Sequence, residues 1–136
     1  MREVTVSRVV AAAPTELSAW LEPATIVEAE GSFAVERVEE RDGTTVVVAS
    51  GPGLQLPLRF EDRDGTIYYT QESERGPFSA METSLETDPV DHGRTRLAAR
   101  SAVELAAPLP FGDRIAAWKR RGELTTLLES AEAAFE

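Results

Sequence analysis

Six short segments rich in β-branched and aromatic residues follow one another between residues 32 and 105, and the first five each end at a tight-turn signal. The predicted strands are residues 32–40, 44–50, 54–62, 66–73, 78–87 and 94–105. Asp-Gly closes the first and the third, and Gly-Pro-Gly closes the second, and such dipeptides favour tight turns between strands. Consecutive strands joined by short turns form an antiparallel meander. This series constrains the fold more than any other feature of the chain.

The predicted sheet has one apolar and one charged face. In residues 94–105, apolar side chains such as Leu97 alternate with charged ones such as Arg96, and successive side chains of a strand point to opposite faces. The same alternation assigns these side chains to the apolar face: Leu56, Leu58, Phe60, Ile67, Tyr69, Gln71, Met81, Leu85, Leu97, Ala99, Ser101, Val103 and Leu105. An apolar sheet face needs a second layer to cover it.

Helices are predicted on both sides of the meander. A strand over residues 3–10 leads into short helices within residues 14–27, and a long helix is predicted over residues 111–135 from its strong helix formers. One apolar stripe of the long helix can cover the sheet: Ala117, Leu124, Leu128, Ala131 and Phe135. Phe111, Ile115 and Trp118 lie well round the helix from that stripe. A bend at Gly122, an irregular first turn or a second partner surface would each explain this second group.

Charge is the strongest compositional signal. The chain has 24 acidic and 14 basic residues, a net charge of −10, a single Lys and no Asn. The acids are scattered along the chain, which favours a generally acidic surface over a patch for a basic partner. High salt screens the self-repulsion of such a surface, so the composition indicates a halophilic archaeon. The negative field argues against nucleic-acid binding.

The chain lacks the usual residues for metal, thiol and cofactor chemistry. It has no Cys, and its one His, His92, falls in a predicted turn, so we predict no metal site and no cofactor. No apolar run approaches the roughly 18 residues of a membrane span, and no leader precedes the first strand. We therefore expect a cytoplasmic protein without an integral membrane segment.

Three stretches of sequence, together with the order of the predicted elements, resemble the START-like (SRPBCC) superfamily. They are VTVSRVVAAAPTELSAWL at residues 4–21, FEDRDGTIYY at 60–69 and DRIAAWKRRGELTTLLESAEAAF at 113–135. That superfamily includes birch-pollen allergens, polyketide cyclases/dehydrases and lipid-transfer domains. The resemblance implies one domain over residues 1–136 with an α+β helix-grip fold, in which a curved antiparallel sheet of about seven strands wraps around the C-terminal helix. It also implies that the first strand pairs with the last, and that an apolar ligand cavity lies between sheet and helix.

The walls implied for this cavity come from the apolar sheet face and both helical regions. They are Trp20, Phe33, Leu56, Leu58, Phe60, Ile67, Tyr69, Gln71, Met81, Leu85, Leu97, Ala99, Ser101, Ile115 and Trp118. Plain core packing is the ordinary alternative for the apolar members. Tyr69, Gln71 and Ser101 could hydrogen-bond a ligand, although backbone or water partners are more ordinary.

Two basic features are interpreted as surface. Arg59 is predicted to point away from the apolar face, which counts against a cyclase-style arginine inside the cavity. Residues 119–121, Lys-Arg-Arg, form a basic patch on the long helix. The patch could contact an acidic partner, but ion pairing with neighbouring Glu residues is the more ordinary interpretation.

Three functions follow as alternatives. The first is binding or transport of a small hydrophobic molecule such as a lipid, a quinone or a polyketide-like compound, and we favour it because no catalytic triad or cofactor motif is present. The second is an enzyme of the cyclase/dehydrase type, in which Tyr69 or a buried water moves a proton. The third is a protein-interaction domain with a filled pocket, whose extra apolar stripe binds a protein. The C-terminal helix could also pair two copies as a homodimer.

Overall fold

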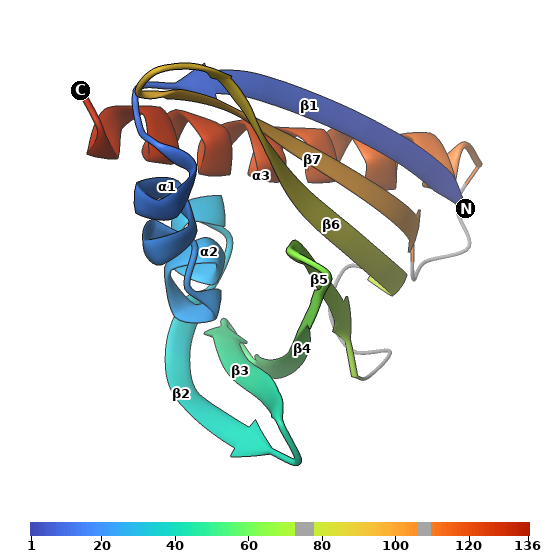
Figure 1. Ribbon diagram of the computed structural model, residues 1–136. Helices are drawn as coiled ribbons and strands as arrows, with labels where there is room; N and C mark the ends of the chain where they lie inside the picture. The colour runs from blue at the N-terminus through green and yellow to red at the C-terminus, as the bar shows by residue number, and fades with distance from the viewer. Residues whose placement is uncertain (73–77, 106–109) are drawn as a thin grey trace.

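The computed structural model describes residues 1–72, 78–105 and 110–136. Figure 1 shows a long helix lying along two strands of a strongly curved sheet, with two short helices at one end. The elements in chain order are β1 (Arg2–Val10), α1 (Pro14–Trp20), α2 (Pro23–Glu30), β2 (Ala34–Arg41), β3 (Thr44–Gly51), β4 (Leu54–Arg63), β5 (Thr66–Gln71), β6 (Phe78–Asp91), β7 (Arg94–Leu105) and α3 (Gly112–Ala134).

The sheet is an antiparallel meander closed at one edge by the first strand. Its order is β1-β7-β6-β5-β4-β3-β2, and β1 pairs antiparallel with β7, with Val4 opposite Ser101. The fold class predicted from the sequence is therefore confirmed. The largest difference in a boundary is at β6, which continues past residue 87 to Asp91 through a register irregularity between Pro89 and Asp91. The turn that follows is correspondingly short, and His92 lies in it.

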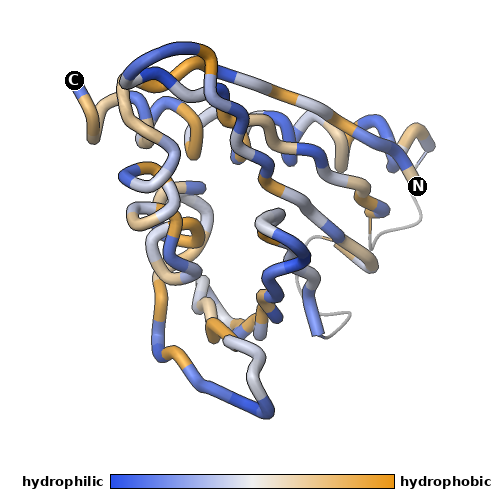
Figure 2. The backbone as a smooth tube through the Cα atoms, viewed as in Figure 1, coloured by the Kyte–Doolittle hydropathy of each residue, from blue (hydrophilic) through white to orange (hydrophobic). Residues whose placement is uncertain are grey.

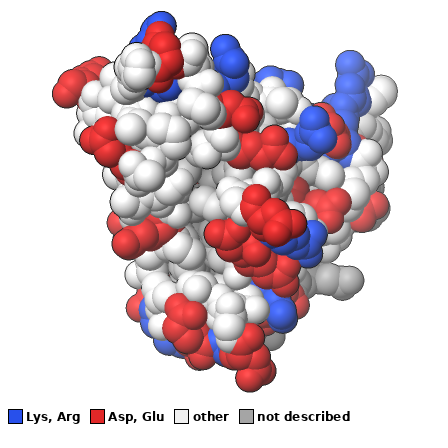
Figure 3. All heavy atoms as spheres, viewed as in Figure 1, with Lys and Arg blue, Asp and Glu red and all other residues white. Residues whose placement is uncertain are grey.

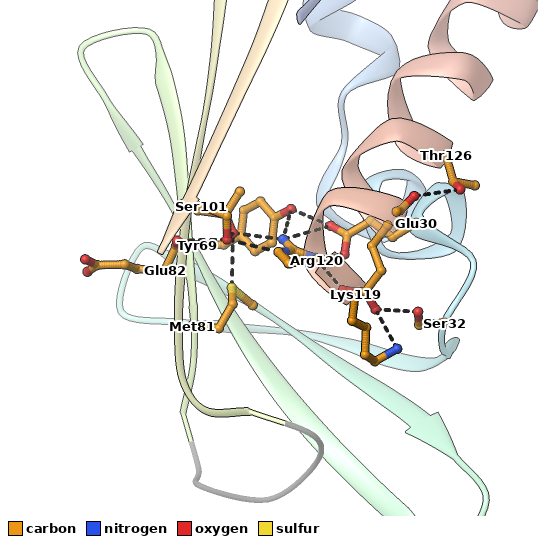
Figure 4. Close-up of polar contacts among 12 residues, drawn as sticks. Glu30, Ser32, Tyr69, Met81, Glu82, Ser101, Lys119, Arg120 and Thr126 are labelled. Atoms are coloured by element: carbon orange, nitrogen blue, oxygen red, sulfur yellow. Dashed lines mark hydrogen bonds and ion pairs between the residues drawn. The ribbon is translucent and has the colours of Figure 1, made fainter. Parts of the chain in front are cut away.

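Local sequence sets the ends of the short helices. Pro14 and Pro23 occupy the first turns of α1 and α2, where a missing N–H costs nothing. Gly31 ends α2 in the left-handed conformation, with φ of 81°, which glycine adopts without strain. Glu30 is therefore the last residue of α2, and its carboxylate points toward α3 (Figure 4).

The long helix α3 packs on β1, β7 and α2. Its buried side consists of Ala116, Ala117, Arg120, Glu123, Leu124, Leu127, Leu128 and Ala131. This agrees with the stripe predicted from the sequence, and Phe135 is partly buried against the same core. Figure 2 shows hydrophobic and hydrophilic residues alternating along β6 and β7, as expected for strands with one buried face.

Candidate functional site

A buried arginine joins α3 to the sheet. Arg120 lies on the buried side of α3 and is 1% exposed. Its Nε donates to the Ser101 hydroxyl at 3.1 Å. Its Nη2 donates to the hydroxyls of Tyr69 and Thr83, each at 2.8 Å. These three partners belong to β5, β6 and β7, so one guanidinium connects the helix to three neighbouring strands (Figure 4).

Two carboxylates complete this group, which we call the Arg120 cluster: Arg120, Glu30, Glu123, Tyr69, Thr83 and Ser101. Nη1 of Arg120 donates to Glu30 at the end of α2 and, at 3.2 Å, to Glu123 one turn along α3. The Glu30 and Glu123 side chains are only 11% and 7% exposed. Glu30 also accepts a hydrogen bond from the Tyr69 hydroxyl. Burying ions is costly unless they are paired and hydrogen-bonded, and the cluster meets that condition.

Burial and charge fix the protonation of two members of the cluster. Burial acts to lower the pKa of Arg120, but Glu30, Tyr69 and Glu123 outweigh it and hold that pKa above its ordinary value. Burial raises the pKa of Tyr69 well above its ordinary value, and Arg120 opposes this only in part. At neutral pH Arg120 is therefore a cation and Tyr69 a phenol. Tyr69 can donate a proton to a hydrogen bond, but it is not a base.

The strand register arranges the cluster as a polar row across the inner face of the sheet. Tyr69 pairs with Thr83, and Thr83 pairs with Ser101. On β4 the row ends at Phe60, whose ring stacks on Tyr69 with 4.5 Å between centroids. Apolar residues flank this row on both sides along the strands. The polar row therefore divides the apolar inner face into two parts.

On one side of the row lies a small, partly enclosed cavity of about 20 Å³, which we call the closed cavity to distinguish it from the wider cleft described next. Its walls are Val27, Glu30, Ser32, Phe33, Leu56, Leu58, Gln71, Phe78, Met81, Arg120 and Glu123. A space of this size holds about one water molecule. Ser32 donates a hydrogen bond to Glu123 at this cavity, and Lys119 lies 3.5 Å from the same carboxylate.

On the other side, beside α1, lies an open cleft of about 340 Å³. Leu21, Phe60, Ile67 and Leu85 give it an apolar lining. Its other lining residues are Ser18, Pro23, Gly43, Thr45, Glu61, Asp62, Gly65 and Thr87. The volume lies within the range of small-molecule sites, roughly 300–1,000 Å³.

Apart from Ile115 and Trp118, the structure separates the predicted cavity residues into four places. Phe33, Leu56, Leu58, Gln71 and Met81 line the closed cavity, whereas Phe60, Ile67 and Leu85 line the cleft. Tyr69 and Ser101 belong to the Arg120 cluster, and Gln71 donates to the Phe78 carbonyl at 2.8 Å. Leu97 and Ala99 are fully buried in the core, and Trp20 packs against that core while partly exposed.

The placement of Ile115 and Trp118 was wrong. They are 45% and 77% exposed, because the buried face of α3 is centred on Arg120 and Leu124 and these two residues lie outside it. Phe111 is likewise 72% exposed. The second apolar group of the helix therefore faces solvent and not the sheet.

Sequence reasoning missed the Arg120 cluster itself. The expected ion pairing of the basic patch is present, since Lys119 and Arg120 both pair with Glu123. The burial of Arg120 was overlooked, although position 120 lies three residues after Ala117 and four before Leu124, inside the apolar stripe. No local signal marks Glu30, whose partner is 90 positions away. Arg59 points outward as predicted and pairs with Glu61.

No known protein family matches the sequence, and no curated protein sequence is similar to it. The similarity lies in solved structures. A protein named XoxI from Bacillus cereus is 12% identical, with a TM-score of 0.76 over 99% of this chain and 96% of that one. A START superfamily protein from Mycobacterium smegmatis is 14% identical, with a TM-score of 0.67 over 97% of this chain and 98% of its own. The Zhui aromatase/cyclase from a Streptomyces species is 18% identical, with a TM-score of 0.66 over 96% of this chain and 93% of its own.

The chain has the helix-grip fold. At these identities the likeness concerns the fold alone, and the chemistry has to come from the site. Within residues 1–72, 78–105 and 110–136, no group of three or more His, Asp or Glu residues could hold a metal ion. No helix in the same ranges has the length and hydropathy that crossing a bilayer requires.

Proposed function

We propose that this helix-grip domain binds a small hydrophobic molecule, and that the molecule lies in the cleft beside α1. The observation that supports this most directly is the apolar lining of a cleft of about 340 Å³ by Phe60, Ile67 and Leu85. A ligand can bind in the cleft without a rearrangement of the Arg120 cluster, because no residue of the cluster lines the cleft. The closed cavity of about 20 Å³ would have to open before it could accept anything larger than water.

The lining of the cleft indicates the chemistry of the ligand. Its apolar part suits an aliphatic or aromatic body, which removes apolar surface from water on binding. Ser18, Thr45 and Thr87 contribute hydroxyl groups to the same cleft, and hydroxyls can both donate and accept hydrogen bonds. The proposed ligand is therefore apolar with one polar end, as a quinone, a lipid or a polyketide-like compound would be.

Binding can be tested with a defined panel of a fatty acid, a quinone and an aromatic polyketide. Each is titrated against the protein, and affinity is measured by calorimetry, with native mass spectrometry giving the stoichiometry. Ile67→Ala removes part of the cleft lining, and we expect it to weaken binding about tenfold, the effect of a few lost methylene contacts. Ile115→Ala is the matched control, because it makes the same change at an exposed position on α3.

A third variant locates the ligand if the cleft is the wrong place. Phe33→Ala enlarges the closed cavity without touching the cleft. If affinity responds to Phe33→Ala and not to Ile67→Ala, the protein binds a ligand but the cleft assignment is wrong. If no compound in the panel binds to any variant, the binding function fails and the filled-pocket alternative, a protein-interaction domain, replaces it.

A cyclase/dehydrase-type enzyme is the second candidate. It is favoured by the presence of Arg120 on the wall of the closed cavity next to Tyr69, where a cation and a phenol could polarise a carbonyl group. Tyr69 would act there as a hydrogen-bond donor, because its pKa is raised. Mass analysis of a linear poly-β-ketone compound after incubation tests this candidate, since an aldol cyclisation followed by dehydration would remove one water.

Three expectations from the sequence stay predictions. They are the halophilic archaeal origin, the cytoplasmic location and the homodimer through the C-terminal helix. The first has a direct test, because the net charge of −10 makes self-repulsion fall as salt rises. A free energy of unfolding that rises steadily up to multimolar KCl is the expected result.

A further inference from the structure

An exposed apolar ridge runs along the first turns of α3. We define the α3 ridge as Phe111, Ile115 and Trp118, which are 72%, 45% and 77% exposed. Ile115 and Trp118 lie three residues apart, on one side of α3, and Phe111 is the residue directly before the first turn of that helix. Trp118 borders surface hollows on both of its sides, so its ring projects between them. Large apolar side chains grouped at a surface commonly mark an interaction site.

Three arginines lie beside this ridge, although the chain as a whole is acidic. Arg2, Arg114 and Arg121 line one hollow together with Trp118. Glu3 is the acidic residue of that hollow, and it pairs with Arg100. Of the arginines in the described parts of the chain, four have no salt bridge, and these three are among them. The fourth is Arg96 on β7. Figure 3 shows basic side chains projecting at the end of the molecule where α3 begins, with acidic ones nearby, and acidic groups scattered among uncharged ones over the rest of the visible face.

We propose that the α3 ridge and its arginines dock on the surface of an anionic lipid bilayer. Trp, Phe and Ile on one side of a helix, flanked by Arg, are the combination that lies in the interface of a bilayer. Anionic headgroups attract the arginines, and Arg114 and Arg121 have no salt bridge to give up. The acidic remainder of the protein is repelled by the same surface, which fixes the orientation with the ridge toward the lipid.

Two other occupants fit the surface less well. A symmetric contact between two copies would bring Arg114 and Arg121 of one copy against the same residues of the other, and like charges repel. An acidic protein segment would need a groove to hold an extended or helical chain. Trp118, at 77% exposed, instead projects outward between two hollows, a shape that suits shallow insertion into a flat surface. The proposal does not depend on the proposed ligand in the cleft.

Vesicle co-sedimentation tests the docking. The protein is mixed with phosphatidylcholine vesicles that contain phosphatidylserine, and separately with pure phosphatidylcholine vesicles. The salt concentration is the lowest at which circular dichroism shows the folded protein. We expect binding to the anionic vesicles and little to the neutral ones. Raising the salt should weaken binding, because it screens the charges. In Trp20→Phe, where Trp118 is the remaining tryptophan, the fluorescence should shift to the blue and become quenchable by brominated lipid.

The variants separate the apolar and the charged parts of the surface. Trp118→Ala should weaken vesicle binding roughly tenfold, because membrane affinity scales with the inserted apolar area. Arg114→Gln with Arg121→Gln should weaken it about 25-fold, at about fivefold per charge. Arg96→Gln is the matched control, because it removes an arginine that also lacks a salt bridge but lies on β7, and it should leave binding unchanged.

Three outcomes would overturn the proposal. One is equal binding to anionic and neutral vesicles. Another is an equal loss of vesicle binding in Arg96→Gln and in the double variant Arg114→Gln with Arg121→Gln. That result would mean that vesicle binding depends on the net charge of the protein and not on this surface. The last is no vesicle binding together with a dimer that Trp118→Ala abolishes in sedimentation experiments, which would assign the ridge to a second copy of the chain.

Discussion

The two sides of α3 carry similar residue types in opposite environments. Arg120 faces the sheet at 1% exposed, and the next residue, Arg121, lies at the surface beside Trp118, which is 77% exposed. Each nitrogen of the buried arginine donates to a hydroxyl or a carboxylate, whereas the surface tryptophan lies outside the core. The comparison shows that the position of a residue around the helix axis, more than its type, decides which side chains enter the interior.

Side chains on the two sides of α3 should also differ in how much they contribute to the free energy of unfolding. The inner side holds charges that are stable only as a complete set, because removing one partner leaves the others buried and unpaired. The outer side holds groups that water already solvates, so their removal costs little. Four predictions test this contrast, beginning with the largest effect.

Arg120→Met should destabilise the fold by about 3–5 kcal/mol, because it leaves Glu30 and Glu123 buried without their cation. The measurement is the free energy of unfolding from a denaturant titration. Arg121→Met is the matched control on the outer side, and it should change that free energy by less than about 0.5 kcal/mol.

A rescue variant distinguishes charge from packing. Adding Glu30→Gln and Glu123→Gln to Arg120→Met removes the unpaired charges and should recover part of the lost stability. If the triple variant is as unstable as Arg120→Met alone, then the loss comes from packing around residue 120 and the electrostatic account of the cluster is wrong.

Tyr69→Phe should cost about 1–3 kcal/mol of unfolding free energy, because it deletes a buried hydroxyl that serves both Glu30 and Arg120. Tyr68→Phe is the neighbouring control on the outer face of β5. Its hydroxyl donates to Glu82 at 2.9 Å near the surface, and its loss should cost about 0.5 kcal/mol or less. Equal losses in the two variants would argue against a special role for the cluster.

The same two tyrosines should separate in an alkaline titration. Burial raises the pKa of Tyr69 well above its ordinary value of 10.0, and burial with the Glu82 hydrogen bond raises that of the more exposed Tyr68. Because the folded state favours the neutral phenol of Tyr69, its stabilising effect is complete below about pH 10 and is lost as the pH rises further. Tyrosinate absorbance should show Tyr68 ionising in the folded protein and Tyr69 ionising only with unfolding. Two ionisations before unfolding would contradict the burial of Tyr69.

The sequence predicted the sheet well because its signals are local. The alternation along residues 94–105 and the Asp-Gly turns are patterns formed by residues only a few positions apart. The strands that these patterns predict pair as a meander. Trp118 shows where this reasoning fails. Its hydrophobicity suggested the interior, but its position on the helix places it outside. The prediction for Trp118 gave more weight to the type of residue than to its position around the helix axis.

The site was harder to predict because its parts are distant in the sequence. Glu30 and Arg120 meet because Gly31 ends α2 opposite the middle of α3. Tyr69, Thr83 and Ser101 share a row because of the register of three strands. The spacing of residues along the strands could assign Tyr69 and Ser101 to the inner face of the sheet. It could not show whether these side chains contact an arginine or a ligand. That outcome depends on how deeply α3 sits against the sheet.

The smallest effect on stability should come from the outer side itself. Trp118→Ala removes a side chain that is 77% exposed, so little apolar surface returns to water on unfolding and the free energy of unfolding should change by less than about 0.5 kcal/mol. The matched inner change is Leu124→Ala on the same helix. Leu124 is fully buried, and its truncation should lower the free energy of unfolding by about 2–5 kcal/mol.

A large loss of unfolding free energy in Trp118→Ala would mean that the α3 ridge is packed against something in solution. Because a partner that binds only the folded state adds to its stability, a loss that grows with protein concentration would identify that partner as a second copy.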